Sequence, residues 1–145
     1  MVPMTKFALL LAAATLPVAA TAATPQQIAD DVSQQQLRAS VEKLVSFGTR
    51  HTLSSQTDPN RGIGAALNWA EEEFSRYSEA CGGCLTIATP SDTVTGRRVP
   101  NPTKVTDILA IQRGTTYPNR VVIISGHIDS RVSDVMDSTS EAPGA

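Results

Sequence analysis

The run Val121-Val122-Ile123-Ile124 restricts the fold of this chain more than any other segment of its sequence. Four consecutive branched apolar residues cannot alternate between a buried face and a solvated face, so a strand made of them is buried on both faces. Such a strand lies in the centre of a sheet that helices cover on each side. The run therefore predicts an α/β layer architecture.

The elements before this run are predicted from the spacing of their apolar residues. Residues 34–47 are expected to form an amphipathic helix, because their apolar positions recur at i, i+4, i+7 and i+8. Residues 61–77 should form a second helix, with Asn60 or Asp58 as its cap. Strands are expected at residues 85–89 and 105–112, with a loop or irregular hairpin between them. Residues 24–33 are interpreted as a loose lead-in.

The N-terminus has the pattern of an export signal. Lys6 precedes an almost continuously apolar stretch over residues 7–20, and Ala20-Thr21-Ala22 fits a small-x-small cleavage site. We expect a signal peptide over residues 1–22 and a secreted or periplasmic mature chain over residues 23–145. The apolar stretch is shorter than the roughly 20 residues that span a bilayer, so no membrane anchor is expected. The alternative is a buried helix.

The two cysteines, Cys81 and Cys84, lie in Cys-Gly-Gly-Cys after the second predicted helix. In an oxidising compartment neighbouring cysteines usually pair, which predicts a local disulfide. A redox pair would instead be placed at the start of a helix, and half of a zinc knuckle would need a second cysteine pair.

Charge and motifs argue against several classes of function. The net charge is −2, and no basic stripe is present to bind the phosphates of a nucleic acid. The sequence has no Gly-x-Ser-x-Gly elbow and no glycine-rich phosphate loop, which disfavours a serine esterase and a nucleotide-dependent enzyme.

The segment Ser125-Gly126-His127-Ile128-Asp129-Ser130 carries the strongest chemical signal. It follows the apolar run, and ligands of open α/β sheets bind beyond the carboxyl ends of strands. His127 with Asp129 two residues later suits a metal-binding imidazole and its carboxylate partner. From the residues alone, a metal site and a local hydrogen bond are equally supported. His51 is interpreted as structural, and Asp134, Asp137 and Glu141 as a solvated acidic loop that could compete for metal.

A resemblance to a known family favours the metal. Gly126-His127-Ile128-Asp129-Ser130, followed by Ala142-Pro143-Gly144-Ala145, resembles the co-catalytic zinc aminopeptidases, which include secreted leucyl aminopeptidases and relatives of glutamate carboxypeptidase. Residues 47–51 and the helix with Ala65, Ala66 and Trp69 are similar to the N-terminal region of that family. The resemblance implies a three-layer sandwich with a mostly parallel central sheet, two zinc ions and a peptide substrate.

Residue by residue, the resemblance makes His127 a zinc ligand and Asp129 the carboxylate that orients it. The bridging Asp, the Glu general base beside a Glu ligand, a further acidic ligand and a final His would follow Ala145. Residues 23–145 would then be the N-terminal part of one catalytic domain, inactive alone. Two alternatives stay open: a glutaminyl cyclase-like acyltransferase of the same fold, which typically uses one zinc ion, and a metal-free binding module.

Overall fold

The computed structural model describes residues 22–144, which divide into a short unit ending at Ser33 and a larger unit beginning at Gln34. The expected signal peptide lies outside the described residues except for Ala22. The short unit contains α1 (Pro25–Asp30), where a loose segment was expected. A capping box explains this helix: Gln27 N donates to Thr24 Oγ1, and Thr24 N donates to Gln27 Oε1.

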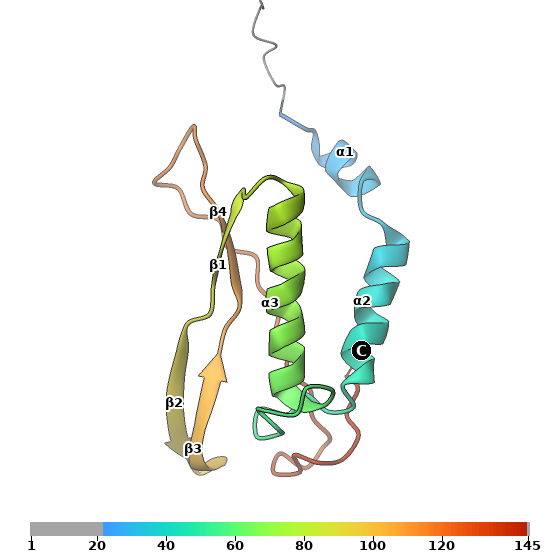
Figure 1. Ribbon diagram of the computed structural model, residues 1–145, viewed down its shortest axis with the longest axis vertical. Coiled ribbons are helices and arrows are strands. Elements are labelled where there is room, and N and C mark those ends of the chain that lie inside the picture. The colour runs from blue at the N-terminus through green and yellow to red at the C-terminus, as the bar shows by residue number, and fades with distance from the viewer. Residues whose placement is uncertain (1–21, 145) are drawn as a thin grey trace, which may run out of the picture. The chain divides into compact units, whose positions relative to one another are not determined.

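Both predicted helices of the larger unit are present, as α2 (Gln34–Ser46) and α3 (Gly62–Ala80) (Figure 1). α2 ends where Gly48 adopts a positive φ of 71°, which favours glycine after a helix. The apolar stripe of α2 is not covered by the described residues: Leu37 and Val41 are 57% and 46% exposed. No helix among residues 22–144 is long and apolar enough to cross a membrane.

The start of α3 is buried, and its cap differs from the expected one. Gly62 to Leu67 are all buried. Ile63 N donates to Ser54 Oγ at 2.8 Å, so the capping oxygen comes from the preceding loop. Neither expected cap, Asn60 or Asp58, serves this role: Asp58 accepts a hydrogen bond from Asn60 N within that loop. The loop folds back over the first turn of the helix, where Ser55 O also accepts from Gly64 N at 3.0 Å.

Four strands form one long antiparallel hairpin: β1 (Leu85–Ala88), β2 (Ser91–Gly96), β3 (Val99–Thr106) and β4 (Leu109–Gln112). β1 pairs with β4 and β2 with β3, and the register continues from Ala88–Leu109 to Ser91–Thr106. Pro90 interrupts the ladder between them, because proline has no N–H to donate. The irregular hairpin considered for residues 91–103 is therefore correct, and the strand expected at residues 105–112 is split in two. β1 packs against α3 (Figure 1).

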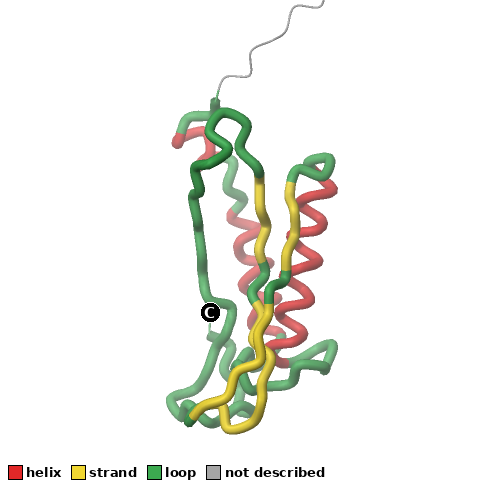
Figure 2. Tube along the Cα trace, turned by 90° about the vertical axis from the view of Figure 1, so that its left-hand side faces the viewer, coloured by secondary structure: helices red, strands yellow, loops and turns green. Residues whose placement is uncertain are grey.

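The strand predicted at residues 121–124 does not form in the described part of the chain. Figure 2 shows the whole stretch after β4 as loop. Val121, Val122, Ile123 and Ile124 are 80–95% exposed, the opposite of the burial expected from their sequence. The physical reason is the absence of a neighbour, since no strand within residues 22–144 pairs with this segment. Both paired ladders are antiparallel, and the parallel three-layer sandwich stays a prediction.

A small apolar core holds the larger unit together. Phe47, Ala65 and Ala66 are buried, and Trp69 and Ile128 pack against them. The rings of Phe47 and Trp69 lie 6.2 Å apart, within the range of a favourable aromatic contact. This cluster joins the end of α2, the first half of α3 and the segment that carries His127 and Asp129.

Candidate functional site

His127 and Asp129 contact each other directly. Asp129 Oδ1 lies 2.9 Å from His127 Nδ1, and the main-chain oxygen of Asp129 lies 3.0 Å from the same nitrogen. Both oxygens are acceptors, so Nδ1 carries a hydrogen, and in the neutral ring Nε2 keeps its lone pair. The His127 side chain is 87% exposed. This is the arrangement in which a neutral imidazole binds a metal ion through Nε2 while a carboxylate orients the ring.

The pair borders a cavity of about 600 Å³ between α3, the hairpin and residues 123–129. Its α3 wall is apolar and consists of Ile63, Leu67, Ala70 and Phe74. Ligand sites are usually concave and mostly apolar, with a few polar groups that fix the orientation of the ligand. His127 and Asp129 are among the polar residues that line this cavity.

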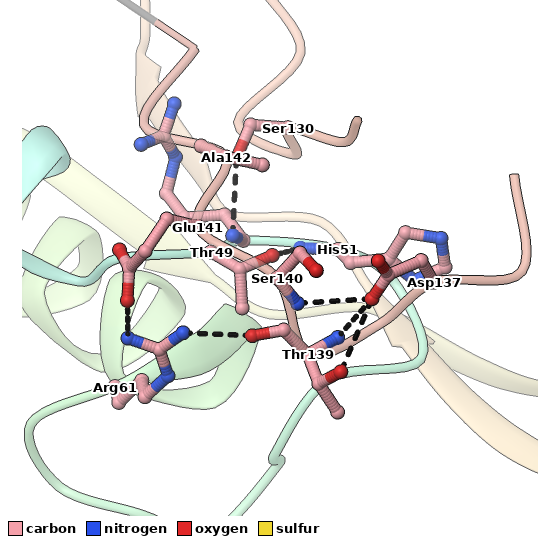
Figure 3. Close-up of polar contacts among 10 residues, drawn as sticks. Thr49, His51, Arg61, Ser130, Asp137, Thr139, Ser140, Glu141 and Ala142 are labelled. Carbon is pink, nitrogen blue, oxygen red and sulfur yellow. Dashed lines mark hydrogen bonds and ion pairs between the residues drawn. The ribbon is translucent and has the colours of Figure 1, made fainter. Parts of the chain in front are cut away.

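Residues 48–50 lie between the segment that contains Asp129 and the segment that contains Ala142. On one side, Ser130 N donates to Arg50 O at 3.3 Å, and Arg50 N donates to Ser130 Oγ at 3.0 Å. On the other side, Ala142 N donates to Gly48 O at 2.9 Å. Ser130 Oγ also donates to Ala142 O, which ties the two outer segments to each other (Figure 3). The two motifs quoted for the family resemblance therefore meet in space.

The carboxylates of the acidic loop bind partners within the loop and Arg61, the residue before α3 (Figure 3). Asp137 accepts hydrogen bonds from Ser140 and Thr139, which hold the pKa of its carboxyl well below the usual value. Glu141 forms an ion pair with Arg61. Asp134 accepts a hydrogen bond from Met136 N at 2.9 Å. These contacts agree with the interpretation of residues 134–141 as a solvated, turn-forming loop.

His51 is buried, and both of its ring nitrogens have partners. Leu53 N donates to His51 Nδ1 at 3.0 Å, so Nδ1 is an acceptor. Nε2 must then carry the hydrogen, which it donates to Val135 O at 3.1 Å. With no lone pair available, His51 cannot bind a metal ion in this arrangement. The structural role expected for it agrees with these contacts.

The described residues fit part of a zinc site. His127 with its Asp129 partner is suited to be one ligand, whereas a catalytic zinc ion takes about three ligands from protein. Within residues 22–144, no group of three or more His, Cys, Asp or Glu side chains could hold a metal ion. The remaining ligands required by the family resemblance are not among these residues.

The structure joins Cys81 to Cys84 in a disulfide at the end of α3. Gly82 and Gly83 adopt positive φ angles of 73° and 83°, which lets the chain reverse between the two sulfurs. Ser78 Oγ donates to Leu85 O at 2.9 Å and fixes the start of β1 beside the helix. The pair follows a helix instead of preceding one, unlike a redox pair.

Two residues at the centre of the site received no role from the sequence. Arg50 is 3% exposed and Ser130 7% exposed, and their contacts span about 80 residues of chain. A single arginine in a polar loop carries no sequence signal of burial. Its one visible clue is its place in Phe47-Gly48-Thr49-Arg50-His51, a segment quoted for the family resemblance.

Comparison with known proteins relates this chain to zinc metalloproteases. It is 47% identical over 116 residues to a probable zinc metalloprotease of Pyricularia oryzae, covering 79% of this chain and 23% of that protein. A probable zinc metalloprotease of Leptosphaeria maculans is 43% identical over 121 residues, covering 83% and 28%. The chain thus spans about a quarter of the length of these relatives. No family model and no solved structure matches it.

Proposed function

We propose that this chain is the N-terminal part of a zinc-dependent peptidase and contributes one ligand to its metal site. The observation that carries the proposal is the hydrogen bond between His127 Nδ1 and Asp129, which leaves Nε2 available. The similarity to probable zinc metalloproteases supports the metal and the reaction class. The cavity beside His127 supports a binding site at this place in the fold.

Each residue has a distinct task in this proposal. His127 would bind zinc through Nε2, and the Asp129 carboxylate would hold the ring and raise the basicity of its free nitrogen. When bound, zinc lowers the pKa of a coordinated water and polarises the carbonyl that is cleaved. The apolar wall that α3 provides, with Leu67 and Phe74, would accommodate an apolar side chain of the peptide.

We further propose that the enzyme is an aminopeptidase with two zinc ions in a three-layer sandwich, on the strength of the family resemblance. A form of the protein that carries the whole catalytic domain should contain about two zinc ions per chain and hydrolyse peptides with a free N-terminus. The same peptides with an acetylated N-terminus should not be cleaved, because an aminopeptidase must bind the free amine.

Metal analysis and product masses from the two peptide sets test this proposal. Cleavage of both sets at internal bonds would show an endopeptidase. It would contradict the proposed aminopeptidase but not the proposed zinc-dependent peptidase. Loss of ammonia from peptides with N-terminal Gln, without hydrolysis, would identify a cyclase. A zinc-free protein that cleaves neither peptide set would contradict both the zinc-dependent peptidase and the aminopeptidase, and would favour a binding module.

We also propose export of this protein, because residues 1–22 have the pattern of a signal peptide and the chain contains a disulfide. Protein recovered outside the cells that produce it should begin at Ala23 or within about two residues of it, as N-terminal sequencing would show. Exported protein that retains Met1 would contradict the cleavage.

A further inference from the structure

The Arg50 side chain is a buried cation that binds four main-chain carbonyls from three segments. Its Nε donates to Ile128 O at 2.7 Å, and its Nη1 donates to Leu44 O and Pro143 O, each at 2.7 Å. Nη2 lies 3.4 Å from Gly144 O. One guanidinium therefore joins the end of α2, the segment that contains Asp129, and the segment that follows Ala142.

Only an arginine suits this position. A guanidinium carries five N–H donors in a rigid plane, whereas a lysine ammonium is a single point with three donors. Burial lowers the pKa of Arg50 below its ordinary value, and the charge of Asp129 opposes that shift. The carbonyl oxygens and the nearby carboxylate compensate for the loss of hydration that burial of a charge entails.

Arg50 holds the main chain on both sides of Asp129. Its side chain binds the carbonyl of Ile128, immediately before Asp129. Its main chain exchanges hydrogen bonds with Ser130, immediately after it. Asp129 itself is partly exposed. Among residues 22–144, its carboxylate is the side-chain hydrogen-bond partner of the exposed His127 ring.

We propose that Arg50 is a positioning residue for the candidate metal site. By fixing Ile128 and Ser130 it directs the Asp129 carboxylate at His127 Nδ1, and so keeps the ring in the tautomer whose Nε2 lone pair is free. The value of that lone pair for zinc rests on the proposed function. The tautomer itself is a property of this chain and can be measured without metal.

The Arg50 guanidinium also holds residues 143 and 144 beside the site. Its bonds to Pro143 and Gly144 hold this segment against Ser130, where the Cβ of an alanine at position 144 would lie 2.6 Å from Ser130 Cβ. Gly144 has a positive φ of 56°, which also favours glycine. Arg50 therefore holds both the main chain around Asp129 and the main chain of residues 143 and 144.

The test is the tautomer of His127, read from long-range ¹⁵N–¹H correlations of the imidazoles in the metal-free chain at about pH 8, where an ordinary imidazole is neutral. Wild type should show the Nδ1–H form for His127. Arg50→Met removes the charge and the N–H donors but keeps a long side chain. It should raise the Nε2–H fraction of His127 at least about threefold, because Asp129 is no longer fixed.

Two controls separate positioning from general destabilisation. Arg61→Met removes an arginine that also binds the 139–141 segment, but does not contact residues 128–130, and should leave the His127 tautomer unchanged. His51 serves as an internal reference, since its Nδ1 accepts a bond and its ring should remain in the Nε2–H form. A folded Arg50→Met chain with an unchanged His127 tautomer would overturn the proposal.

If Arg50→Met does not fold, Ser130→Ala gives a second test, because it removes the hydroxyl that accepts from Arg50 N while the guanidinium stays. It should shift the His127 tautomer in the same direction by a smaller factor, and a folded variant without any shift would overturn the proposal. Suppose that Arg50→Met shifts the His127 tautomer as expected, but a longer form of the protein is inactive and binds no zinc. The positioning role of Arg50 would then stand, and only the proposed function would be refuted.

Discussion

His127→Ala is expected to abolish peptidase activity in a form of the protein that carries the whole catalytic domain, and to remove the zinc ion that the proposed function assigns to His127. An imidazole donates a full ligand bond that an alanine methyl group cannot replace, and a catalytic site with about three protein ligands does not tolerate the loss of one. Bound zinc after dialysis, measured beside the rate of peptide hydrolysis, checks both effects.

Asp129→Asn should have a smaller effect, with zinc affinity lowered by about 10–100-fold. The amide can still accept from His127 Nδ1, but it lacks the charge that strengthens the bond. Asp134→Asn is a matched control, because Asp134 also accepts a local hydrogen bond and lies in the loop that follows. Full activity in the His127→Ala protein, or equal losses in both Asn variants, would contradict the assigned site.

Gly64→Ala should destabilise the larger unit strongly, although alanine is the better helix former. In an exposed helix interior this change would stabilise by about 1 kcal/mol. Here the new Cβ would lie 2.3 Å from Gln56 O, a main-chain atom of the loop that covers the start of α3. The loop would have to move, which breaks the bond from Gly64 N to Ser55 O, so we expect a net loss of about 3 kcal/mol.

Gly126→Ala is the control for this prediction. A Cβ at position 126 would meet no atom within 4 Å, and Gly126 is not among the glycines with positive φ, so little change is expected. Chemical unfolding followed by circular dichroism would give both free energies of unfolding. A Gly64→Ala chain as stable as wild type would show that the loop does not pack as described.

The local elements could be predicted because the interactions that define them lie within a few residues of each other. The 3.6-residue period of apolar side chains placed α2 and α3 to within a few residues at each end. Proximity in sequence likewise brings Asp129 to His127, two residues away, and Cys84 to Cys81. Such short separations in sequence cost little chain entropy to close, although in our proposal the direction of the Asp129 carboxylate also depends on Arg50.

Burial could not be predicted in the same way, because it depends on which distant segments are present to cover a side chain. The apolar run Val121–Ile124 has the sequence of a buried strand, yet it is exposed where no strand lies beside it. Arg50 lies in a loop rich in polar residues, yet it is buried, and its side chain donates to the main-chain oxygens of Ile128 and Pro143.

The sequence by itself determined helices α2 and α3 and the cysteine pair, and it placed Asp129 within reach of His127. Tertiary structure alone decided that Arg50 binds both sides of Asp129, that Ser54 caps α3, and that Gly64 must lack a side chain. Contacts of the second kind join segments between about 9 and 90 residues apart, whose approach requires loops to close. A side chain that packs across such a closed loop has no periodic signal in the sequence, because its partner is fixed only when the chain has folded.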